Sequence, residues 1–130
     1  MDREMQEVSE AITAFLNYIE QAKTEYTTAH EAVGTEDKRL QDLLHELEFA
    51  ENENKKRRAG TKLQQSRRER RRQKDKVKRL ERLVKFCNEP ENKKTLNRMR
   101  QMLGEQRKEE KYLNGKRVYK PRMEAGKNEK

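Results

Sequence analysis

The chain has 130 residues and a formal net charge of +9, with 44% charged residues, 30% hydrophobic residues, one cysteine and no tryptophan. This length allows one domain, while the low apolar content excludes a large globular core and favours a long helix or coiled coil that buries only a seam. The lone cysteine excludes an intrachain disulfide, and no stretch has the length or pattern of a membrane span or signal peptide, so we expect a cytoplasmic protein.

The first element is a heptad-patterned helix over about residues 2–33. Apolar residues recur there at alternating spacings of three and four, which places them on one stripe of a helix. The stripe continues in the same register beyond residue 33. The sequence therefore predicts a helix-packing seam that consists of Val8, Ile12, Phe15, Ile19, Tyr26, Leu40, Leu43 and Leu47.

Residues 34–37, Gly-Thr-Glu-Asp, are typical of a helix boundary. Gly34 suits a helix end, and Thr35 can cap a following helix. We therefore predict a turn here and a second helix over about residues 36–88. Because the heptad register does not change across Gly34, one continuous helix is the alternative interpretation.

The second helix has a seam of its own, which is less apolar. Its positions keep the spacings of three and four, and Gly60 is either a break, a kink or a tolerated helical glycine. Asn88-Glu89-Pro90 ends the helix, because the residue before a proline avoids the helical region. The seam comprises Leu63, Ser66, Arg70, Gln73, Val77, Leu80, Val84 and Cys87.

A shorter third helix is predicted over about residues 90–113, with Leu96, Met99 and Leu103 on one face and Gly115 at its end. We thus expect an all-α fold in which residues 1–115 form an antiparallel helical hairpin or coiled coil with a shorter C-terminal helix. Residues 116–130 are expected to be a basic, partly disordered tail.

Charge is divided between the two parts of the chain. Residues 1–54 contain 14 acidic and 4 basic residues, a net of −10, whereas residues 55–130 contain 10 acidic and 29 basic residues, a net of +19. The segment from residue 55 to 82 alone holds 15 Lys or Arg and three acids. An antiparallel acidic helix can neutralise only part of this charge, so a surplus remains for an external polyanion.

We therefore select the basic residues of this segment, with part of the tail, as candidates for contact with a nucleic acid or a nucleoprotein. Arginine dominates the set, and its planar guanidinium binds phosphate bidentately. The candidates are Lys55, Lys56, Arg57, Arg58, Lys62, Arg67, Arg68, Arg70, Arg71, Arg72, Lys74, Lys78, Arg79, Arg82, Arg117, Tyr119 and Arg122.

No residue pattern indicates catalysis or a cofactor. His30 and His45 are 15 positions apart and Cys87 is remote, which does not fit the close ligand spacing of a helical metal site. There is no glycine-rich phosphate loop and no nucleophile motif. We expect a protein that is not an enzyme and binds neither metal nor cofactor.

The segments 41–48 (QDLLHELE), 67–72 (RRERRR), 103–108 (LGEQRK) and 117–122 (RVYKPR) carry a resemblance that extends over most of residues 5–122. In this pattern the chain resembles small, charged coiled-coil proteins encoded by prophages and mobile elements of Firmicutes. The resemblance implies a phage or mobile-element accessory protein of the host cytoplasm. Some such proteins are anti-CRISPRs, which inhibit a host nuclease effector.

Three functions remain open at this level. The first is a non-enzymatic protein that binds a nucleic acid or nucleoprotein through its basic helix, for instance as an anti-CRISPR-like inhibitor. The second is a structural or scaffolding coiled coil that acts by self-association, for example as a homodimer through the N-terminal heptad, or by binding a partner helix. The third is an inhibitor whose acidic first helix imitates a nucleic acid.

Overall fold

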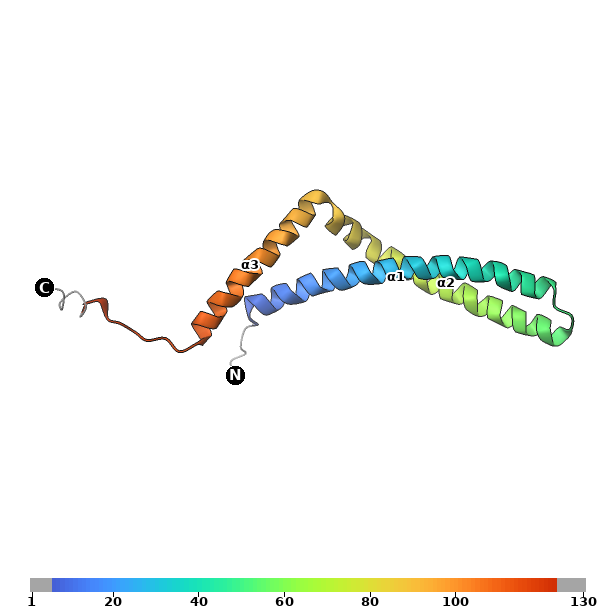
Figure 1. Cartoon of the computed structure of the whole chain (residues 1–130), viewed down its shortest axis with the longest axis horizontal. Helices are drawn as coiled ribbons and strands as arrows, with labels where there is room; N and C mark the ends of the chain where they lie inside the picture. The colour runs from blue at the N-terminus through green and yellow to red at the C-terminus, as the bar shows by residue number, and fades with distance from the viewer. Residues whose placement is uncertain (1–5, 124–130) are drawn as a thin grey trace.

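The structure, a computed structural model that describes residues 6–123, is built from three helices: α1 (Val8–Glu48), α2 (Glu53–Asn88) and α3 (Pro90–Asn114). Figure 1 shows α1 and α2 as a long antiparallel hairpin, with α3 turning back toward the beginning of α1. The described residues contain no strand. The predicted all-α hairpin with a shorter C-terminal helix is confirmed.

The predicted turn at Gly34 is wrong, because this residue lies inside α1, a continuous helix of 41 residues. No glycine among the described residues has a positive φ, so Gly34 does not adopt the conformation that ends helices. The Thr35 hydroxyl donates to the carbonyl of Glu31 at 3.1 Å, a bond made inside a helix, and does not cap a new one. The helix also continues through Gly60.

The hairpin turn lies instead between Glu48 and Glu53. Asn52 has an extended backbone, and its side-chain Oδ1 accepts the backbone N–H of Lys55 at 2.9 Å, which caps α2. The second helix consequently begins at Glu53 and not near residue 36. The first helix begins at Val8, later than predicted, because Glu7 has an extended conformation.

The predicted break at Pro90 is confirmed. Glu89 has φ −62° and ψ 137°, ends α2 and precedes α3, in which Pro90 occupies the first turn. The Asn92 side-chain Nδ2 donates to the carbonyl of Phe86 at 2.7 Å. A side chain of α3 thus provides a hydrogen-bond donor for one of the last carbonyl groups of α2. The third helix ends at Asn114, as the following glycine predicts.

A small apolar core is formed by residues from the first part of α1, the last turns of α2 and α3. All three helices contribute to it, and Ile19 is the most deeply buried large side chain, with 1% exposure. This cluster fixes the position of α3 after the bend at Pro90. Its buried members are Leu16, Ile19, Cys87, Leu96 and Leu103, with Ile12, Leu83 and Met99 packed against them.

The two predicted seams differ in their outcome. Every member of the second seam, Leu63 to Cys87, is buried or partly buried. In the first seam, Ile19 and Leu43 are buried and Ile12, Tyr26, Leu40 and Leu47 are partly buried. Val8 and Phe15, however, are 51% and 48% exposed, which contradicts their assignment to the seam.

The bend at Pro90 explains this difference. Over residues 9–20 of α1, contacts with α3 are made by Ser9, Thr13, Leu16 and Glu20, one position beyond the predicted stripe. After the bend, α3 contacts this part of α1 at positions that leave Val8 and Phe15 about half exposed. Residues 2–5 of the predicted first helix and residues 124–130 of the predicted tail lie outside the described residues.

Within residues 6–123, no helix combines the length and apolarity that a membrane span requires.

Candidate nucleic-acid interface

Most of the basic residues of α2 lie on the side of the helix that faces away from α1. Seam residues such as Ala59, Ser66 and Val77 are buried against α1, whereas the positions between them project outward. All candidates between Lys55 and Arg82 are exposed, with the exception of Arg70, which is partly buried. The seam of the helix thus determines which face carries the charge.

Two of these candidates form ion pairs with α1. Arg70 donates from Nε to Asp37 at 2.6 Å, and Lys62 pairs with Glu46 at 3.2 Å. Arg70 is only one-quarter exposed as a side chain and serves the hairpin, although it was selected as a binding candidate. The expected neutralisation of the basic helix by the acidic helix therefore consists of two direct pairs in the described chain.

Three further candidates pair with acids close to them in the sequence. Lys55 contacts Glu51, Lys56 contacts Glu53, and Arg72 contacts Glu69. Such exposed pairs contribute about 0–1 kcal/mol each and exchange readily for another anion. Ten exposed cations of the segment have no ion pair with any acid of the described chain: Arg57, Arg58, Arg67, Arg68, Arg71, Lys74, Lys76, Lys78, Arg79 and Arg82.

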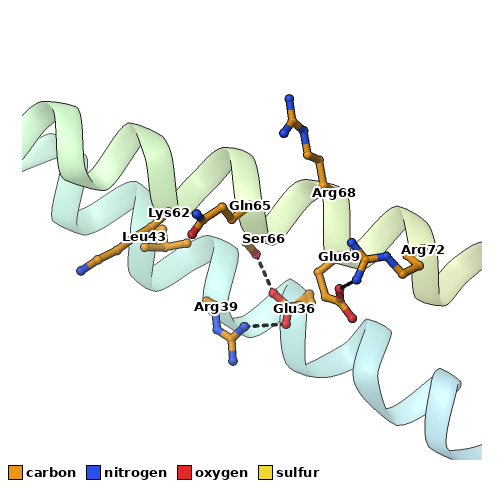
Figure 2. A pocket seen from close by; sticks show the side chains of 9 residues that line it. All are labelled: Glu36, Arg39, Leu43, Lys62, Gln65, Ser66, Arg68, Glu69 and Arg72. Carbon is orange, nitrogen blue, oxygen red and sulfur yellow. Dashed lines mark hydrogen bonds and ion pairs between the residues drawn. The ribbon is translucent and has the colours of Figure 1, made fainter.

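A shallow groove of about 500 Å³ lies between α1 and α2 and is shown in Figure 2. At its base Glu36, with 5% exposure, accepts the Ser66 hydroxyl at 2.8 Å and Arg39 Nη1 at 2.6 Å. These bonds offset the cost of burying a carboxylate. Arg68, which also lines the groove, points away from it into solvent.

The groove is therefore part of the interface between α1 and α2. The cation of the groove without an acidic partner in the described chain, Arg68, points outward from it. Its acids, Glu36 and Glu69, both have cationic partners. This arrangement places the candidate interface on the outer surface of α2 and not in the groove.

The candidates of the tail lie beyond α3. Residues 116–121 have no regular secondary structure, and Tyr119 is 85% exposed. Arg117 lies over the ring of Tyr112, 5.5 Å from its centroid, while Arg122 is exposed. In Figure 1 this segment extends away from the hairpin, so the structure does not bring it together with the basic segment of α2.

Some polar contacts were not recognised in the sequence. The Ser9 backbone N–H donates to Glu110 Oε2 at 2.9 Å, its hydroxyl donates to Oε1, and Gln106 donates to the same carboxylate. The Ser9 and Gln106 hydrogen bonds hold the pKa of Glu110 below its usual value. Lys76 was also missed, although its position in the basic segment provides the same signal as its neighbours.

The described residues contain no group of three or more His, Cys, Asp or Glu placed to hold a metal ion. Cys87 is buried in the apolar core. The charged outer face of α2 is consequently the strongest candidate for a functional site in the described residues.

Comparisons with protein-family models, curated proteins and solved structures found no match.

Proposed function

We propose that this chain is a non-enzymatic protein that binds a nucleic acid, alone or within a nucleoprotein, through the outer face of α2. The observation that carries the proposal is the set of ten exposed cations without an acidic partner in the described chain. Lysine and arginine gain affinity for phosphates by releasing condensed counterions, and this gain needs no base recognition.

The arrangement of charge supports an extended polyanion as the partner. Residues 55–82 of a helix span roughly 40 Å, and Arg67, Arg71, Lys74 and Lys78 recur along one side of it. Over the same length a nucleic-acid duplex presents on the order of 25 phosphates. A small anion would use only a fraction of this surface.

The acidic helix gives the interaction an orientation. Exposed acids such as Glu31 and Asp42 belong to α1, and α1 covers only the seam side of α2. A polyanion is repelled by the first helix and attracted by the second. The hairpin therefore binds with α2 toward the nucleic acid and with α1 as its support.

The test is a charge-reversal variant in which Arg67, Arg68, Arg71 and Arg79 are each replaced by Glu. These four are exposed and unpaired within the described chain, so the two ion pairs between α1 and α2 are kept. Binding to fluorescently labelled single strands and duplexes of about 30 nucleotides is measured by anisotropy. We expect the variant to lose binding while its helical circular dichroism persists.

A matched control reverses four cations of α3, namely Lys93, Arg98, Lys108 and Lys111, which are exposed and unpaired in the described chain. Its net charge changes by the same amount. The proposal requires that the α2 variant weaken binding far more than this control. Equal losses would show that overall charge, and not the α2 surface, governs the interaction.

The more specific form of the proposal is an anti-CRISPR-like inhibitor of a host nuclease effector, encoded by a phage or mobile element. It is supported by the resemblance to small, charged coiled-coil proteins of prophages and mobile elements. The long basic face of α2 would also suit the nucleic-acid channel of such an effector. A pulldown from host lysate, with and without nuclease treatment, separates a direct protein partner from one bridged by nucleic acid.

A scaffolding coiled coil is the second candidate. It is favoured by Val8 and Phe15, which continue the seam of α1 but remain half exposed. A second copy of the chain or a partner helix could cover this uncovered part of the stripe.

A further inference from the structure

We propose that the tip of the hairpin is a stacking site for an unpaired base of a single-stranded nucleic acid, with Phe49 as the platform. This inference rests on the proposed function and specifies the form of nucleic acid that is bound. The site lies where α1 ends and α2 begins, at the extreme end of the molecule in Figure 1.

The exposure of Phe49 is the first observation. It is 73% exposed, more than either of the other two phenylalanines of the chain, Phe15 at 48% and Phe86 at 60%. Its ring lies parallel to the imidazole of His45, with 6° between the planes and 6.3 Å between the centroids. The ring thus has an aromatic neighbour and still presents most of its surface to solvent.

Cations surround this ring. A hollow of about 420 Å³ is lined by Phe49 and Ala50 from the turn, and by Lys55, Arg58 and Lys62 from α2. Glu46 also lines it and pairs with Lys62 at 3.2 Å, while Lys55 pairs with Glu51 outside the hollow. Arg58 has no acidic partner in the described chain and is the cation most available to a phosphate.

An aromatic platform beside cations suits a single strand. A base stacked in a duplex has no free face, whereas an unpaired base can stack on a phenyl ring while its flanking phosphates meet Lys or Arg. Residues 55–82 contain no aromatic residue. Phe49 therefore supplies, at the beginning of the basic surface, the stacking contact that the surface itself lacks.

The hollow adjoins the charged outer face of α2, because Arg58 belongs to both, while Lys55 and Lys62 line the hollow beside it. A strand whose phosphates follow α2 would deliver one base to the ring of Phe49. Stacking of one base on an aromatic side chain increases affinity by roughly 5- to 150-fold.

The experiment uses the Phe49→Trp variant of the full chain. The protein has no tryptophan, so the new indole reports on this position alone. Single-stranded oligo-dT and oligo-rU are titrated against it, and a duplex of the same length is titrated in parallel. We expect the tryptophan emission to be quenched by at least one of the single strands, and much less by the duplex.

A second variant, Phe49→Ala, is expected to bind the responsive single strand at least about fivefold more weakly, with duplex binding unchanged. Phe15→Trp, at an exposed position of α1 distant in sequence from the basic segment, is the control for non-specific quenching. The two single strands distinguish DNA from RNA.

Binding that leaves the indole emission of Phe49→Trp and the affinity of Phe49→Ala unchanged would overturn the stacking site and leave the proposed function intact. An equal loss of single-strand and duplex binding in Phe49→Ala would overturn it as well. If neither form of nucleic acid bound the wild-type chain, both proposals would fail.

Discussion

Replacement of Gly34 by alanine is expected to stabilise the protein, because this glycine lies inside a continuous helix. Gly34 is exposed, and a Cβ added to it meets no other atom within 4 Å. The substitution therefore adds no clash and removes no contact. Its effect reduces to the helix propensity of the two residues, and alanine is favoured over glycine by about 0.8–1.0 kcal/mol in a helix interior.

This free energy corresponds to an increase of about 0.3–1 M in the urea concentration at the midpoint of unfolding. The assay is equilibrium urea unfolding followed by circular dichroism at 222 nm. Gly115→Ala is the matched control, because its Cβ would lie 3.1 Å from the Lys111 carbonyl at the end of α3. We expect no stabilisation from the control.

A turn at Gly34 would produce the opposite result. A glycine in the left-handed region of a turn cannot be replaced by alanine without strain, so Gly34→Ala would then destabilise the protein. A lowered midpoint for this variant would refute the continuous helix.

Two further predictions concern the contacts at the beginning of α1. Because Ser9 and Gln106 lower the pKa of Glu110, this carboxylate stabilises the fold above its unfolded value of about 4.5, and the stabilisation is lost as the pH falls through the lowered value. The difference in unfolding free energy between wild type and Glu110→Gln should accordingly shrink below pH 4.5, and a pH-independent difference would contradict the role of Ser9. The scaffold candidate predicts that the wild type sediments as a dimer at micromolar concentration and Phe15→Asp as a monomer. A monomeric wild type that still binds nucleic acid would exclude that candidate.

The sequence predicted the elements whose signals are local. Pro90 marked the bend, and the alternating spacing of residues 63–87 identified the face of α2 that is buried. Most basic residues outside this seam project away from α1, although Lys62, which is also outside it, pairs with Glu46 of α1.

The length of α1 and the position of the hairpin turn were harder to predict, because helix propensity and the heptad pattern pointed to different helix boundaries. Gly34 and Thr35 are weak helix formers, yet the unbroken heptad on both sides prevailed because tertiary packing outweighs propensity. The true turn depends on Asn52, a good capping residue in a strongly charged stretch without other turn signals.

The remaining features depend on how the helices pack against one another. Val8 and Phe15 fit the heptad, but α3 contacts this part of α1 at neighbouring positions and leaves them about half exposed. The buried Glu36–Ser66 bond and the Ser9–Glu110 bond join residues that are 30 and 101 positions apart. No periodicity in one helix reveals which polar group on another will meet it.

The central claim is that the outer face of α2 contacts phosphates, and the salt dependence of binding tests it most directly. For wild type and the four-residue α2 variant, the logarithm of the binding constant is plotted against the logarithm of the salt concentration. We expect a steep slope for the wild type that becomes shallower by about 3–4 units when the four contacts are lost. A wild-type slope near zero, or one that the variant leaves unchanged, would contradict the claim.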